Sequence, residues 1–187
     1  MKMKIITLVP AVLAVAVLLI AAPAPAWAAG GNTGFGFNAT DISGFPTGAA
    51  RLTGGGAFNL GTGFVKSAGG FRCTEDVLQG PLGQPGDPCL AGEGVRWDTV
   101  ELLASTMFKC TGAAAEPLKT AVTGTNATGN NTVVLVADFY RAGDGNDESF
   151  TAQMIVSDGD IAPDINGIQN VWIQGVGCAS AIANFSS

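Results

Sequence analysis

The stretch "AARLTGGGAFNLGTGFVKSAGGFRC", from Ala49 to Cys73, carries most of the information about the fold. Strand-like runs lie on both sides of "NLGTG", which has the composition of a hairpin turn. "GGGAF" is echoed by "AGGF", so that Phe58 and Phe71 stand thirteen residues apart. Glycine weakens helix interiors but suits the bulges and bends of sheets. The stretch therefore predicts two strands of a meander whose glycines allow curvature.

The remaining chain continues as short apolar runs separated by turn residues, with no convincing long helix. "TVVLVADFYRA" (132–142) is the clearest strand, and "SFTAQMIVS" and "QNVWIQGVGCA" supply the last two. Glycine, 27 of 187 residues, recurs inside apolar stretches rather than in a linker. We expect an all-β fold, a single antiparallel β-barrel or a closely related sandwich of about seven or eight strands. A closed barrel would leave no open edge.

The pattern GGGxF, a turn, and then GF-V-x-x-x-GGF resembles that of secreted bacterial β-rich proteins of uncharacterised function. Their arrangement is similar to small antiparallel barrels of the allene oxide cyclase-like or lipocalin-like kind. The likeness covers Ala49 to Phe71 and extends only loosely to the rest of the chain. It implies a type of fold and no activity, because such folds carry many unrelated functions.

The N-terminus has the pattern of an export signal. Lys2 and Lys4 precede an apolar run from Ile5 to Ala22, and small residues up to Ala28 fit a cleavage site. A membrane anchor is the alternative, but prolines interrupt and follow the run and no basic stop-transfer cluster comes after it. We expect cleavage after Ala28, which leaves residues 29–187 as one secreted β domain with no membrane association.

The expected mature domain is acidic. Two of the nine basic residues lie in the signal, so seven basic and fifteen acidic residues remain, a net charge of −8. Such a surface repels phosphate backbones and anionic lipid, which argues against nucleic acid or a membrane as partner. A small molecule or another protein is left as the expected partner.

Four cysteines lie in this domain: Cys73, Cys89, Cys110 and Cys178. An even number in an exported chain indicates two disulfides, with three pairings available. We favour Cys73 with Cys89, which closes a loop rich in glycine and proline, and Cys110 with Cys178. A zinc site is the alternative, but the chain has no CxxC pair.

The chain contains no histidine, and this excludes several catalytic mechanisms. Ser-His-Asp and Cys-His sets, and metal sites with histidine ligands, cannot form. If the protein is an enzyme, aspartate and glutamate must perform most of the acid–base chemistry.

The sequence "AGDGNDESF" contains an acidic turn that is a candidate calcium site. Its candidate ligands are Asp144, Asn146, Asp147 and Glu148. It resembles one copy of the RTX nonapeptide, although RTX sites form between stacked repeats and this chain has a single copy. The favoured interpretation is an ordinary tight turn, and the same holds for the run from Asp158 to Asp164. We therefore expect no resident cofactor, with calcium as the only candidate.

Two strands carry charges within apolar sequence. In "VRWDTVELL", Arg96 and Asp98 share one face while Trp97 and Glu101 share the other. If the polar faces lined the barrel interior, they would form the floor of a ligand pocket. The candidate pocket residues are Arg96, Trp97, Asp98, Asp138, Tyr140 and Trp172. The alternative is that the charged residues face water and that both tryptophans belong to the core.

Three classes of function follow from these features. The leading hypothesis is a non-catalytic extracellular module that binds a small apolar or carbohydrate ligand or a partner protein. The alternative is a carboxylate-based isomerase, cyclase or lyase that uses Asp98, Glu101 or Asp138. A structural envelope or matrix protein that self-associates is the third. No recognisable catalytic motif favours the enzyme.

Overall fold

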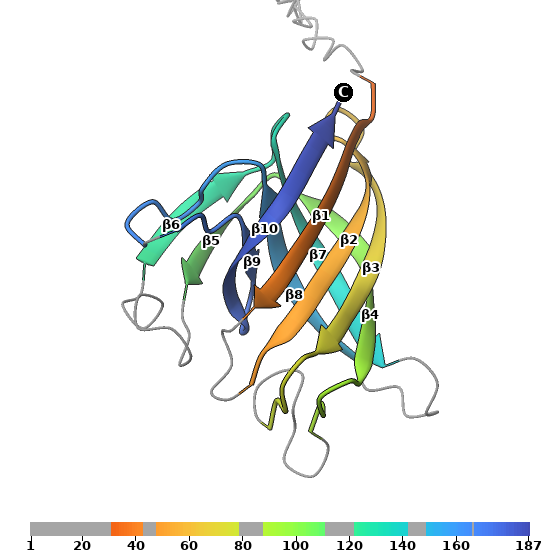
Figure 1. Ribbon diagram of the computed structural model, residues 1–187. Coiled ribbons are helices and arrows are strands. Elements are labelled where there is room, and N and C mark those ends of the chain that lie inside the picture. The colour runs from red at the N-terminus through yellow and green to blue at the C-terminus, as the bar shows by residue number, and fades with distance from the viewer. Residues whose placement is uncertain (1–30, 43–47, 79–87, 111–121, 142–148, 166) are drawn as a thin grey trace, which may run out of the picture.

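The fold is all-β in a computed structural model that describes residues 31–42, 48–78, 88–110, 122–141, 149–165 and 167–187 (Figure 1). The described residues form ten strands and no helix. In chain order the strands are β1 (Thr33–Ile42), β2 (Ala50–Asn59), β3 (Phe64–Cys73), β4 (Gly94–Leu103), β5 (Ser105–Cys110), β6 (Val122–Ala127), β7 (Thr132–Arg141), β8 (Ser149–Ser157), β9 (Val171–Ile173) and β10 (Gly177–Ser186). Within these ranges, no helix capable of spanning a membrane is present.

Eight of the strands close into one antiparallel barrel in the order β1-β10-β9-β8-β7-β4-β3-β2, with β2 returning to β1. The strands β5 and β6 form a separate two-stranded sheet. The predicted all-β barrel is confirmed, and "NLGTG" is the turn of the β2–β3 hairpin. The sequence reading did not identify β1, although Phe35, Phe37 and Ala39 alternate there as the buried residues of a strand should.

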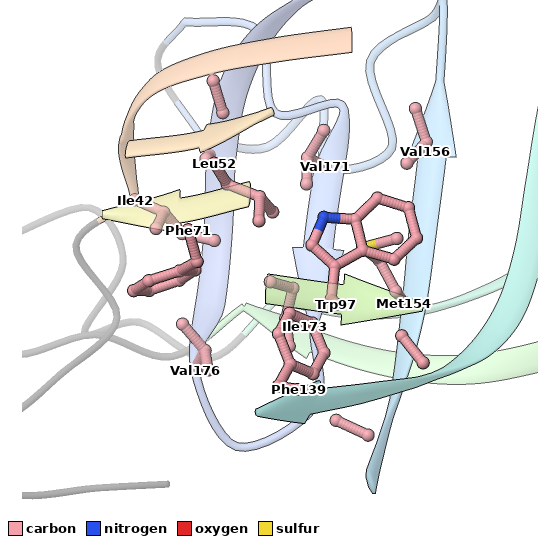
Figure 2. Packing of buried hydrophobic residues seen from close by; sticks show 14 of the residues in the cluster. Ile42, Leu52, Phe71, Trp97, Phe139, Met154, Val156, Val171, Ile173 and Val176 are labelled. Atoms are coloured by element: carbon pink, nitrogen blue, oxygen red, sulfur yellow. The ribbon is translucent and has the colours of Figure 1, made fainter. Parts of the chain in front are cut away.

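The barrel interior is filled by apolar side chains, which alternate with outward residues along the barrel strands except at the register shifts in β1 and β4. Trp97 lies in the middle of this interior and is 0% exposed. Its ring packs against Phe37 at a centroid distance of 6.0 Å and against Phe139 at 6.4 Å. Figure 2 shows the indole among the inward side chains, with Phe139 close by.

The glycines of the opening stretch make the space that this indole occupies. Gly54 and Gly69 are paired across β2 and β3, and a Cβ atom at either position would collide with the ring of Trp97. The indole nitrogen donates a hydrogen bond to the Thr53 carbonyl at 3.1 Å, so its one polar group is satisfied inside the barrel. Glycine is required here for close approach as well as for the expected curvature.

A second apolar cluster lies on the outside of the barrel. The β5–β6 sheet covers outward residues of β7, β8 and β9, and Trp172 of β9 is buried beneath it, 5% exposed. The Trp172 indole donates to the Lys109 carbonyl at 2.9 Å. The Cys110–Cys178 disulfide joins β5 to β10 beside this cluster, so the small sheet is covalently attached to the barrel.

Both predicted disulfide pairings are confirmed. Cys73–Cys89 spans the loop after β3, and Val77 and Cys89 also exchange backbone hydrogen bonds of 2.9 and 3.1 Å within it. The disulfide and these two hydrogen bonds therefore hold the two ends of the loop together. On the chain-entropy model a closed loop of this length contributes about 3 kcal/mol to the free energy of unfolding.

The barrel closes along only part of its length. The β3–β4 ladder runs from Arg72–Gly94 to Ala68–Asp98, although β3 continues along β2 and β4 continues along β7. At the next position, side-chain hydrogen bonds replace the backbone ladder. The hydroxyl groups of Ser67 and Thr99 are hydrogen-bonded to each other, and Thr99 Oγ1 also donates to the Ser67 carbonyl at 3.1 Å. Beyond this pair the two strands diverge.

The seat of Trp97 can be tested with a pair of neighbouring glycines. We expect Gly69→Ala to lower the free energy of unfolding by about 2–3 kcal/mol, because the added methyl collides with the indole and the Thr53 carbonyl. Gly70→Ala is the control: its Cβ points outward, 3.9 Å from the nearest atom, and the expected change is within about 0.5 kcal/mol. Urea denaturation followed by tryptophan fluorescence measures both. Equal effects of the two substitutions would contradict the close packing of Trp97 against Gly69.

Candidate functional site

The polar residues of β4 and β7 meet on the outer face of the barrel. Arg96 is paired with Tyr140, and Asp98 with Asp138, while the intervening pair Trp97–Phe139 points inward. These polar residues therefore do not line the barrel interior, as a pocket floor inside the barrel would require. Large aromatic side chains occupy the inward positions, and strict alternation places their polar neighbours outside.

Tyr140 and Asp98 form the best-defined contact of this outer cluster. The Tyr140 hydroxyl donates to Asp98 Oδ2 at 2.6 Å across the β4–β7 pair. This hydrogen bond, together with desolvation and the negative charges of Asp98 and Asp138, raises the pKa of Tyr140 above its ordinary value of 10.0. The positive charge of Arg96 opposes the increase. The cluster thus holds a neutral phenol against a carboxylate.

Asp138 is placed unfavourably for stability. It lies directly opposite Asp98 in the β4–β7 ladder, and like charges at directly opposite positions destabilise a sheet. One of its carboxylate oxygens, Oδ1, is buried and finds no hydrogen-bond partner among the described residues. A buried acceptor without a partner carries a free-energy cost, and such costs are often found at functional sites.

A β-bulge changes the position expected for Glu101. The β4–β7 register shifts between Thr99 and Glu101, so Val100 is the extra residue. Glu101 is then paired with Val136 and is exposed on the outer face, the same face as Arg96 and Asp98. The expectation that it shares the face of Trp97 is wrong, because simple alternation does not hold across a bulge.

Two clefts adjoin on this outer face, and Ala68 and Asp98 line both of them. The larger, of about 650 Å³, lies where β3 and β4 diverge. The smaller has a volume of about 310 Å³ and extends past Arg96 to Tyr140. We call the two together the β3–β4 groove. Its lining residues are Asn32, Gly55, Gly56, Ala57, Phe64, Val65, Lys66, Ser67, Ala68, Gly69, Arg96, Trp97, Asp98, Thr99 and Tyr140.

The groove combines three kinds of surface. Its β2–β3 side consists largely of glycine and alanine, so the backbone is accessible there. Aromatic side chains stand at its two ends: Phe64, 41% exposed, and Tyr140, half-buried. Charged and hydrogen-bonding groups lie between them, among which Lys66, Asp98 and Arg96 are exposed. Sequence reasoning identified the β4 and β7 residues but not the contribution of β2 and β3.

Trp172 is not brought together with the other candidate residues. It lies under the β5–β6 sheet, where a third cleft of about 500 Å³ is bordered by Met107, Lys109 and Gln174 as well. Trp97, in turn, is enclosed by the core and only borders the groove from beneath. The two tryptophans therefore do not form a common stacking surface.

The calcium candidates Asp144, Asn146, Asp147 and Glu148 lie outside the described residues. The second acidic run has the contacts of a turn: Asp160 Oδ1 accepts hydrogen bonds from the backbone N–H groups of Ala162, at 3.0 Å, and Gln169, at 3.1 Å. Across the described ranges, no group of three or more His, Cys, Asp or Glu side chains is placed to share a metal ion.

Comparison of the chain with protein-family models, with curated proteins and with solved structures finds no match.

The Tyr140–Asp98 contact predicts an abnormal alkaline titration. Tyr140 is the only tyrosine, so the phenolate absorbance reports this residue alone. We expect its pKa to lie above 10.0 in the folded protein and to fall in Asp98→Asn, because the carboxylate acceptor is lost. A raised folded-state pKa means that the contact stabilises the fold below the unfolded pKa and that this stabilisation is lost as the pH rises through the folded value. An ordinary pKa in the native protein would refute the contact.

Asp138 offers a test of whether the outer cluster costs stability. We expect Asp138→Asn to raise the free energy of unfolding by about 1 kcal/mol, because the substitution removes one of two opposed charges and lets the new amide donate to Asp98. Glu101→Gln, an exposed carboxylate of the same face without an opposed charge, should change it by less than about 0.5 kcal/mol. Denaturation at neutral pH measures both variants. A destabilised Asp138→Asn would show that the carboxylate has a favourable partner.

Proposed function

We propose that this protein is an exported, non-catalytic module that binds a neutral carbohydrate chain in the β3–β4 groove. The two disulfides suit the oxidising conditions outside the cytosol. The observation that carries the proposal is the continuity of the two clefts over Ala68 and Asp98, which makes one elongated site on a rigid sheet.

The chemistry of the groove suits sugar hydroxyls and sugar rings. Asp98 uses Oδ2 to hold Tyr140, and its other oxygen has no hydrogen-bond partner among the described residues. Arg96 and Lys66 are exposed donors without an ion-pair partner among those residues. Alternating acceptors and donors can bind vicinal hydroxyl groups, while the exposed face of Phe64 offers an apolar surface for a ring. The small residues of β2 and β3 let a flat ring approach the sheet.

The barrel interior is a weaker candidate for ligand binding. The inward side chains of Trp97, Phe58 and Phe139 are each at most 1% exposed and belong to one packed apolar cluster. A lipocalin-like internal cavity would require many of these side chains to move. The resemblance to small ligand-binding barrels thus extends to the architecture and supports no internal site.

The carboxylate-based enzyme stays a prediction and is less well supported. Asp98 and Glu101 are exposed, so neither lies in the enclosed, water-excluding pocket that acid–base catalysis uses. Asp138 is half-buried but does not line either cleft of the groove. The geometry favours recognition over chemistry.

Binding can be tested with a printed array of neutral bacterial and plant oligosaccharides, followed by calorimetric titration of those retained. We expect Asp98→Asn to weaken binding at least about tenfold, since hydrogen bonds to a charged acceptor contribute about 1.5–3 kcal/mol. Phe64→Ala should weaken it by a similar factor through loss of the stacking surface.

Glu101→Gln is the matched control, because this carboxylate lies on the same strand and face but outside the groove. It should bind as the native protein does. The proposal fails if no oligosaccharide on the array is retained, or if the retained ones bind Asp98→Asn and Glu101→Gln equally well.

A further inference from the structure

The last strand of the barrel has one edge that is only partly covered. β10 is paired with β1 from Ser186 back to Ala179, but on its other side β9 covers only Gly177–Ala179. The next position is completed by a side chain: the Asn170 amide donates to the Ala181 carbonyl at 2.9 Å and accepts from the Ala181 N–H at 2.7 Å. Asn170 thus ends the pairing on that side, and Figure 1 shows β10 continuing upward beside β1.

Beyond Ala181 the backbone groups on this edge have no partner among the described residues. In an antiparallel strand, the N–H and C=O groups of every second residue point to the same side. The backbone N–H and C=O groups of Ala181 point toward Asn170. Those of Ala183 and Phe185 therefore point to the same side. No ladder among the described ranges uses this part of the edge.

This edge also lacks the features that protect other open edges of the barrel. Where β3 leaves β4, its unpaired part carries the exposed Lys66, and the corresponding part of β4 carries Glu101 and a bulge. Charges and bulges at such places prevent pairing with other chains. Residues 182–186 of β10, "IANFS", contain no charge and no proline, and Ile182 is 71% exposed.

We propose that this edge pairs with the same edge of a second copy of the chain, giving a two-fold symmetric dimer. An antiparallel arrangement centred on Asn184 pairs Ala183 of each copy with Phe185 of the other, and each pair exchanges both N–H···O bonds. The pairing is self-complementary, as a two-fold interface requires. In this register Ser186 of each copy lies opposite the exposed Ile182 of the other.

The edge itself favours a second copy over a basic or acidic peptide as the occupant, because its uncharged residues offer no ion pair to a charged peptide. The expected mature chain has a net charge of −8, so two copies repel each other wherever acidic surfaces meet. The uncharged end of β10 is a place where they can approach without opposing carboxylates. The dimer is independent of the β3–β4 groove, because neither cleft of the groove includes a residue of β10.

Sedimentation equilibrium of the exported protein, from about 1 μM to about 1 mM, tests the proposal. We expect a monomer–dimer equilibrium in the native protein. Ala183→Pro removes a donor from the free edge and no bond of the β1 ladder, and should raise the dimer Kd at least about tenfold. Ile182→Lys, which places a charge on the edge, should do the same.

Met107→Lys is the control, since it introduces the same charge at a side chain that is 80% exposed on β5. It should leave the dimer Kd within about twofold of the native value. Thermal melts of each variant establish that it is folded, and Ile182→Lys remains informative if Ala183→Pro does not fold. A native protein that stays monomeric over the whole range overturns the proposal, as does a dimer that both β10 substitutions leave unchanged.

Discussion

The packing of one indole ring inside the barrel is the constraint on which the rest of the structure depends. Trp97 fills the centre of the interior, and the two strands facing it have glycine at Gly54 and Gly69 because any side chain there would occupy the same space. Its N–H is satisfied by the Thr53 carbonyl, so a polar group is buried at no net loss. The glycines of the β2–β3 hairpin and the position of Trp97 on β4 therefore depend on one contact region.

The same packing places the polar residues of β4 and β7, and the clefts beside them, on the outside of the barrel. Since aromatic and aliphatic side chains occupy the inward positions, the polar residues of β4 and β7 are left on the outer face. The outer surface of β2 and β3 is recessed because glycine and alanine line it. The divergence of β3 from β4 after Asp98 makes the groove deeper. Apolar side chains thus fill the described part of the interior, and the small residues of β2 and β3 leave a groove on the outside of the barrel.

The groove and the free edge of β10 have the same origin, because the barrel is incompletely closed at two places. Two short ladders, β3–β4 and β9–β10, join the wall formed by β10, β1, β2 and β3 to the wall formed by β4, β7, β8 and β9. Side chains continue both joins by one position, through Ser67 with Thr99 and through Asn170 with Ala181. Beyond these positions one join opens into the groove and the other leaves an uncharged edge. The Asp98–Asp138 pair places two like charges opposite each other on the outer face, which adds a local cost in stability.

The sequence by itself predicted the all-β class and a barrel or closely related sandwich of about seven or eight strands, because alternation and turn residues are local signals. Of the three possible disulfide pairings, it favoured the one that the structure shows. It also singled out Arg96, Asp98, Asp138 and Tyr140. Only the tertiary structure decided that these residues face outward and that Glu101 joins them, because alternation does not say which face is buried and a bulge reverses it. The clefts over Gly55 and Ala68, the contact of Trp97 with Gly54, and the free edge at Ala183 depend on pairing between distant strands, which no local pattern records.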